Sequence, residues 1–347
     1  METQDYQYEL THPNPNSKNA LFLHILFQKK IKHSFILLVA EVAKVLQINL
    51  DSELSLLQNL DANKKFNLIV YYKYYKLLNL MKSNNVVECK KLLDPLCSDL
   101  SNKAYTDKIK ICELNNFDWE TEFQLEALAD KGGGNFVKLP ATRFTHCQQN
   151  VNKALQLIET YCPNMYAEIC DHVTLLRLIG RGETRFIAGS SLKYFGAISI
   201  VDPGDDIDAL FYFFDIITHE TSHLHLHLLM SLDPMVTNRN ELYYSPARNT
   251  SRPLEGIFHA HFVFYRLLYL YKNAAAHFTE KNNTKIRLDE SELNKSIIEL
   301  PWKYQERWQA YKYKFYQGEA IIKQGAKLTT AGNALLDNMS NNVASWD

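Results

Sequence analysis

The sequence contains few glycines, prolines and cysteines. Its 12 Gly and 10 Pro in 347 residues exclude a low-complexity or collagen-like protein. The one glycine cluster, at residues 131–135 (KGGGN), has neither the GxGxxG nor the GxxxxGK spacing of a phosphate-binding loop. No two of the six cysteines form a CxxC pair, so we expect reduced thiols that mostly fill apolar core positions.

An excess of one charge is also missing. Lys and Arg total 38 against 39 Asp and Glu, which gives no electrostatic reason to expect a nucleic-acid partner. The aromatic-basic segment Trp302–Tyr316 also carries Gln305 and Glu306, and we interpret it as a packing helix. The most apolar run, Leu254–Tyr271, contains charged residues and histidines and is too polar for a membrane span, and the N-terminal residues lack a signal-peptide pattern. We therefore expect a cytoplasmic protein without a membrane partner.

The residue pattern predicts a mostly helical α+β fold. Helical periodicity fills residues 19–61, where Asp51 stands as an N-cap, and Asn67–Met81, and no glycine occurs before Gly132. Short strands are predicted at 184–188 and 194–201. We therefore predict a helical N-terminal region, 1–130, and a second region, 131–347, in which a zincin-like helix lies beside a short β-sheet whose edge faces the site and could bind an extended peptide.

A long, mostly buried helix is predicted from residue 205 to 232. Asp205 and Asp206 are its N-cap candidates, and Pro234 stops it. It contains His219-Glu220-Thr221-Ser222-His223, an HExxH motif. Chance would supply roughly 0.02–0.03 such matches in a chain of this length. Because the two histidines are four residues apart, they lie on one helix face and can bind one metal ion.

Two further histidines follow on the same predicted helix. His227 lies roughly 12 Å along the helix axis from His219, which is too far for both to bind one ion. His225 points away from the pair. We interpret both as imidazoles that support a ligand or pack in the core.

The third metal ligand must come from another segment. Pro253 can open a helix on which Glu255 and His259 share a face, after a loop predicted to be irregular from Pro246 to Pro253. Glu241 lies 18 residues after His223, near the spacing of thermolysin-like peptidases. His259 is favoured because a histidine within an apolar helix needs a partner, but Glu255 and Glu241 stay open.

The run from Phe195 to Arg266 resembles the α-ketoglutarate-dependent HExxH-type peptide β-hydroxylases. The resemblance rests on FGAISIVDP (Phe195–Pro203), HETSH (His219–His223), SPAR (Ser245–Arg248) and RPLEGIFHAHFVF (Arg252–Phe264). It implies a ribosomally synthesised precursor peptide as substrate. It also implies Fe(II) held by His219, His223 and His259, with α-ketoglutarate and O2 as cosubstrates and hydroxylation of a side-chain β-carbon as the reaction.

That chemistry assigns tasks to residues near the motif. The distal carboxylate of α-ketoglutarate needs a cation, and the planar fork of an arginine binds a carboxylate through two parallel hydrogen bonds. Arg248 and Arg252 precede His259 and are the candidates. Iron is a consequence of the resemblance, because three histidines would also suit zinc.

Glu220 separates the oxygenase from its main alternative, a zinc metallopeptidase. In a peptidase Glu220 would be the general base that activates the metal-bound water, whereas an oxygenase needs no attacking water. Leu226 and Leu229 stand where the metzincin motif HExxHxxGxxH has Gly and His, which argues against that subclass. A non-catalytic peptide-binding or scaffold role is a third hypothesis. The sequence does not indicate the oligomeric state.

Overall fold

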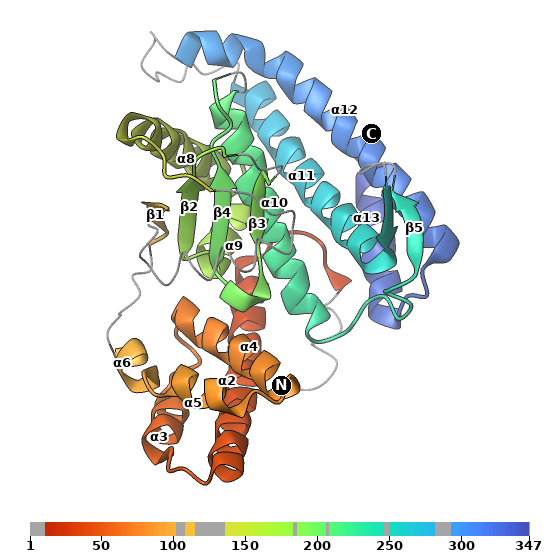
Figure 1. Cartoon of the computed structure of the whole chain (residues 1–347). Coiled ribbons are helices and arrows are strands. Elements are labelled where there is room, and N and C mark those ends of the chain that lie inside the picture. Colours follow the sequence, from red (N-terminus) through yellow and green to blue (C-terminus); the bar gives the residue numbers. More distant parts are fainter. Residues whose placement is uncertain are drawn as a thin grey trace. The chain divides into compact units, whose positions relative to one another are not determined.

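The computed structural model describes residues 11–101, 108–114, 136–182, 186–205, 208–245, 250–281 and 293–346, without the side chains of 99, 101, 276–281 and 293–306. The fold is mostly helical (67%), with a small sheet and a helical N-terminal region, which confirms the predicted class (Figure 1). No described helix is both long and apolar enough to cross a membrane. All six cysteines are free thiols, as expected.

The chain forms two compact units, each assembled from separate segments. Unit 1 comprises Met1–Ser17, Asn152–Glu168 and Phe213–Asp347, and unit 2 comprises Lys18–Val151 and Ile169–Tyr212. The backbone crosses between units within four helices, α2 (Ser17–Leu46), α8 (Ala141–Tyr161), α9 (Pro163–His172) and α10 (Ala209–Met230). The boundary predicted at 131–135 lies outside the described residues, so the division into 1–130 and 131–347 stays a prediction.

Unit 2 contains a four-stranded sheet of order β1-β2-β4-β3. The β1–β2 and β2–β4 pairs are parallel, and β3 is antiparallel to β4. Leu68 and Tyr72 of a preceding helix pack against the sheet residues Leu175 and Ala197. The strands are β1 (Lys110–Glu113), β2 (Leu175–Ile179), β3 (Ala188–Ser190) and β4 (Ala197–Val201).

Two of these strands, β1 and β2, were not predicted from the sequence. All five residues of β2 are buried, so the strand lacks the alternation that marks a half-exposed strand. The strand predicted at 194–201 begins only at Ala197, because Gly196, with φ of 100°, turns the chain into it. The strand predicted at 184–188 is displaced to Ala188–Ser190, and residues 183–185 lie outside the described part of the chain.

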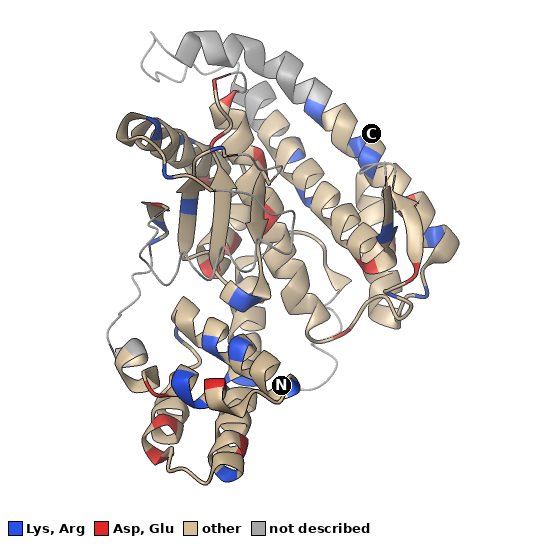
Figure 2. Cartoon of the chain, in the orientation of Figure 1, with Lys and Arg blue, Asp and Glu red and all other residues tan. Residues whose placement is uncertain are grey.

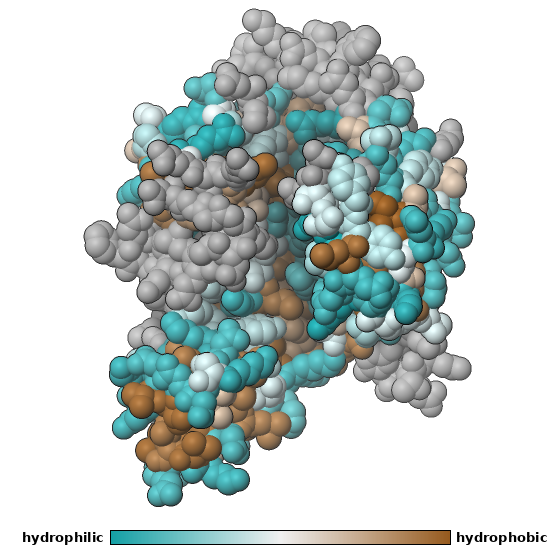
Figure 3. All heavy atoms as spheres, turned by 45° about the vertical axis from the view of Figure 1, so that its right-hand side comes forward, coloured by the Kyte–Doolittle hydropathy of each residue, from teal (hydrophilic) through white to brown (hydrophobic). Residues whose placement is uncertain are grey.

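Helices form the rest of unit 2. Asn67 caps α4 by accepting a hydrogen bond from the backbone N–H of Ile69, as its position before the apolar run predicts. Asp51 is not the N-cap of its helix but the first helical residue, after Leu50. Charged residues are spread over these helices (Figure 2), and apolar patches are visible on their surface (Figure 3). Leu37 and Val87 are among the exposed apolar residues. The helices are α2 (Ser17–Leu46), α3 (Asp51–Asn59), α4 (Leu68–Lys82), α5 (Val86–Leu93) and α6 (Leu96–Ser101).

In unit 1, helix α11 (Leu254–Lys281) packs along α12 (Leu293–Gly325) and against α13 (Thr330–Ala344). Within the predicted packing segment, Phe315 is fully buried and stacks on His261, with ring centroids 4.2 Å apart. Thr329 caps α13 by accepting a hydrogen bond from the N–H of Gly332. These contacts give α11 a fixed position between its neighbours.

An antiparallel hairpin of β5 (Leu242–Ser245) and β6 (Thr250–Pro253) precedes α11. The prediction of an irregular loop from Pro246 to Pro253 is therefore wrong for 250–253, while 246–249 lie outside the described residues. The error arose because strand pairing joins distant residues, and the short TSRP segment has no strand pattern of its own. Hence Arg252 lies on a strand.

A buried polar network in unit 2 centres on His24 of α2. Its Nδ1 lies 2.9 Å from the carbonyl oxygen of Asp171, and its Nε2 lies 3.2 Å from the Tyr71 hydroxyl. Burial lowers the pKa of His24 to about 4, although the hydrogen bond to the Asp171 carbonyl opposes that shift. His24 is therefore neutral at pH 7.

We expect His24 to make folding sensitive to mild acid. Between pH 6.5 and about 4 the unfolded state binds a proton on His24 that the folded state does not, so the free energy of unfolding falls as pH falls. The contribution is about 1.4 kcal/mol per pH unit. In urea unfolding between pH 5 and 7, the free energy of unfolding should depend less on pH in His24→Gln than in wild type, by the equivalent of about one proton. The exposed His33→Gln control on α2 should keep the wild-type dependence, and an unchanged slope in His24→Gln would contradict the assignment.

Candidate metal centre

Helix α10, which carries the HExxH motif, starts later than predicted. Its N-cap is Asp208, whose Oδ1 accepts hydrogen bonds from the N–H groups of Leu210 (3.1 Å) and Phe211 (3.3 Å). Asp205 instead forms an ion pair with Arg143, and Asp206 lies outside the described residues. The choice between neighbouring aspartates depends on the approach of the chain, which the sequence does not specify.

One stripe of α10 is accessible, and the rest of the helix is buried. From Phe211 to the helix end, every side chain that is not buried belongs to a set spaced by three or four residues. Such spacing describes one face of a helix. The helix is otherwise mainly apolar, and few of its residues are charged (Figure 2). The stripe consists of Tyr212, Ile216, His219, His223, His227 and Met230.

The structure brings the three predicted metal ligands together within unit 1. The Nε2 atoms of His219 and His223 lie 3.2 Å apart, and the Nδ1 atoms of His223 and His259 lie 3.4 Å apart. Two nitrogen ligands of one ion lie about 3.1–3.4 Å apart when each bond is 2.0–2.1 Å long. The donor set therefore fits an ion at His219 and His223. His223 turns a different nitrogen to His259, so His259 completes a three-histidine site only after a ring rotates.

The two carboxylates considered as third ligands are placed differently. Glu241 is exposed, and its Oε2 accepts a hydrogen bond from Asn238. Its backbone carbonyl accepts from the N–H of Leu254, at the start of α11. Glu255 is partly exposed on the first turn of α11. Of the three candidates, His259 contacts a motif histidine: its Nδ1 lies 3.4 Å from Nδ1 of His223.

Arg252 lies on β6 opposite Tyr243, and directly opposed residues of an antiparallel pair share a sheet face. Its guanidinium rests against the first turn of α11, where a Cβ at Gly256 would lie 3.5 Å from Nη2. Gly256 and His259 are three residues apart and so are neighbours on the helix surface. The structure thus places Arg252 on the side of α11 that carries His259. Arg248 lies outside the described residues.

Glu220 is buried, with 5% of its surface exposed, and is not part of the accessible stripe. The next two motif residues are also buried and bond to their own helix: the Thr221 hydroxyl donates to the Ile217 carbonyl, and the Ser222 hydroxyl donates to the Thr218 carbonyl. The motif residues between the two histidines therefore pack inside the protein.

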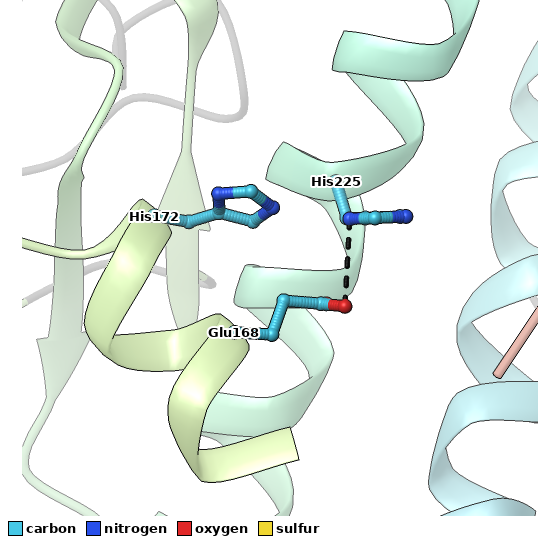
Figure 4. A group of neighbouring side chains, drawn as sticks. All are labelled: Glu168, His172 and His225. Carbon is cyan, nitrogen blue, oxygen red and sulfur yellow. Dashed lines mark ion pairs between the residues drawn. The ribbon is translucent and has the colours of Figure 1, made fainter. Parts of the chain in front are cut away.

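His225 belongs to a separate buried cluster, as its position on α10 predicts. Glu168 of α9 lies 3.5 Å from its Nδ1 and forms an ion pair with Arg266 of α11 (Figure 4). Burial, and secondarily Arg266, hold the pKa of His225 well below its usual value. His172 lies one turn along α9 from Glu168, but it belongs to unit 2. Within unit 1, Arg266 already supplies the positive charge that buried Glu168 needs.

A second polar cluster holds α10 to its neighbours and was not found from the sequence. Buried Asp215 accepts hydrogen bonds from the hydroxyls of Tyr271 (2.6 Å) and Tyr311 (2.5 Å) and forms an ion pair with Arg307. Burial raises the pKa of Asp215, while Arg307 opposes that shift. The partners of Asp215 come from α11 and α12, which are distant in the sequence. The one sequence signal for the cluster was an aspartate within an apolar helix.

Comparison with known proteins adds no family assignment. No model of a protein family matches the chain, and no curated protein is similar to it.

The metal site predicts a specific order among histidine and glutamate variants. We expect His219→Ala and His223→Ala to lose stoichiometric Zn(II) or Fe(II), because each removes one of two nitrogens 3.2 Å apart. His259→Ala should weaken binding, while Glu241→Ala, Glu255→Ala and the exposed control His146→Ala should bind as wild type. Elemental analysis and competition titration measure this. Full occupancy in His259→Ala with loss in either glutamate variant would contradict the choice of third ligand.

The Asp215 cluster predicts a large effect on stability. Asp215→Ala leaves Arg307 and two tyrosine hydroxyls without their acceptor, so the free energy of unfolding should fall by about 3–5 kcal/mol. The control Asp205→Ala removes an ion pair of a 92% exposed side chain and should unfold close to wild type in urea. Equal unfolding midpoints for the two variants would show that the cluster does not stabilise the protein.

Proposed function

We propose that this chain is an Fe(II)- and α-ketoglutarate-dependent oxygenase that hydroxylates the β-carbon of a side chain in a ribosomally synthesised precursor peptide. The family resemblance supplies the reaction and the substrate class. The metal is supported by His219 and His223 on the accessible stripe of α10 and by buried His259 of α11, which contacts His223. We place the reaction in the cytoplasm, on the sequence alone.

The position of Arg252 carries the proposal. Its guanidinium lies against Gly256, one turn of α11 before His259. α-Ketoglutarate brings a distal carboxylate that an arginine fork at this position can bind through two hydrogen bonds. The hairpin places Arg252 next to α11, which supports a role for its guanidinium as the clamp.

Each residue of the site has a separate task. His219, His223 and His259 would hold the iron through three nitrogens and leave the remaining positions open. When iron and both cosubstrates are bound, they supply the oxidation: the C–H bond, O2 and α-ketoglutarate become C–OH, succinate and CO2. Arg252 orients the cosubstrate. The buried Thr221 and Ser222 keep the helix between the two motif histidines packed in place.

A zinc metallopeptidase is the alternative that the HExxH helix also supports. The 3.2 Å separation of the Nε2 atoms suits zinc as well as iron. A peptidase needs Glu220 to reach a metal-bound water, and its burial away from the accessible stripe counts against that role. We therefore favour the oxygenase.

Cosubstrate binding tests the clamp without knowledge of the peptide. In anaerobic calorimetric titrations of Fe(II)-loaded protein with α-ketoglutarate, Arg252→Ala should raise Kd at least tenfold, because a charged hydrogen bond contributes about 1.5–3 kcal/mol. The exposed Arg239→Ala control on the same connection should bind as wild type. Equal affinity in both variants would remove Arg252 from the site.

Product analysis separates the two reactions. With Fe(II), ascorbate, α-ketoglutarate and candidate precursor peptides, an oxygenase forms succinate and adds one oxygen to an intact peptide. Cleaved peptide without succinate, abolished in Glu220→Gln, would establish the peptidase instead.

A further inference from the structure

The two ring nitrogens of His259 face different neighbours on α10. Nδ1 lies 3.4 Å from Nδ1 of His223, and Nε2 lies 3.0 Å from Sδ of Met230. His223 and Met230 are seven residues apart on the accessible stripe, so they stand two turns apart on one face. The His227 ring lies between them on the stripe, with its centroid 4.7 Å from that of His259. All four side chains belong to unit 1.

The contact between Nε2 of His259 and Sδ of Met230 bears on which nitrogen of His259 carries hydrogen. A neutral imidazole has one N–H donor and one acceptor nitrogen, whereas a thioether can only accept. Contact between Nε2 and Sδ is favourable when Nε2 carries the hydrogen. The lone pair of His259 is then on Nδ1, the nitrogen on the side of the motif histidines.

We infer that Met230 is a positioning residue that fixes the tautomer of His259 so that Nδ1 is the nitrogen offered to the metal. This inference rests on the proposed metal site. In the metal-free protein the Nδ1 lone pair accepts from Nδ1–H of His223, which leaves the His223 Nε2 lone pair facing His219 Nε2 at 3.2 Å. For His259 Nδ1 to bind the ion, the His223 ring turns its N–H away, while Nε2 of His259 keeps its contact with Met230.

The thioether of Met230 differs from the usual partner of a metal-binding histidine. Metal-binding histidines usually donate their second N–H to a carboxylate, a carbonyl or water, which makes the imidazole a stronger ligand. A thioether is a weaker acceptor, so it selects the tautomer and raises ligand strength less.

Conservative substitution of Met230 provides the first test. Met230→Leu keeps an apolar side chain and removes the acceptor, so Co(II) affinity in competition titrations should fall about tenfold, the lower end for a lost supporting hydrogen bond. Met230→Gln supplies an amide oxygen and should recover most of that affinity. Met339→Leu, at a fully buried methionine of α13, should bind Co(II) as wild type. Equal thermal unfolding of the variants excludes misfolding as the cause.

A spectroscopic readout tests the tautomer itself. In metal-free protein labelled with 15N-histidine, the His259 signals, assigned by comparison with His259→Gln, should show hydrogen on Nε2 in wild type and lose that preference in Met230→Leu. Hydrogen on Nδ1 in wild type, or unchanged Co(II) affinity in Met230→Leu, would overturn the inference. If His219→Ala also binds Co(II) as wild type, the proposed metal site itself fails, which is a distinguishable result.

Discussion

Burial of α10 on every side but one is the constraint on which the candidate site depends. The helix is mainly apolar, and its two buried charged contacts, Asp215 with Arg307 and His225 with Glu168, are closed by partners on other helices. The remaining accessible positions are a single stripe, and the histidines of the motif lie on it. Three of the six stripe residues are histidines, and the stripe is the part of α10 that a ligand can reach.

The pairing of His219 with His223 could be predicted because it is local: 3.6 residues per turn bring i and i+4 together in any helix. His259 could be favoured over the two glutamates but not established as the third ligand, since its approach depends on how α11 meets α10. Met230 gave no signal, because a methionine near a helix end has the same pattern as any apolar residue. Its contact with His259 exists only through tertiary structure.

The mostly helical fold class was predictable because helical patterns are also local, whereas the strands were not predictable. Helical periodicity is recognised within a few turns of the chain, whereas the predicted caps Asp51 and Asp205 were wrong because the cap depends on how the preceding chain approaches the helix. Strand β2 is buried on both faces, so its run of apolar residues is indistinguishable from a helix segment. Strand β6 owes its conformation to β5, across residues that carry no hairpin signal of their own.

Strand β6 leads directly into α11, so the position of Arg252 relative to His259 depends on how β6 pairs with β5. The carbonyls of Arg239 and Glu241 accept from the N–H groups of Glu255 and Leu254, so the start of the helix is tied to the start of the hairpin. Strand side chains alternate between faces. A single-residue insertion or deletion in β6 would therefore rotate Arg252 to the outer face, beside exposed Leu242 and Tyr244, and move its guanidinium away from α11 while both motifs remained recognisable in the sequence.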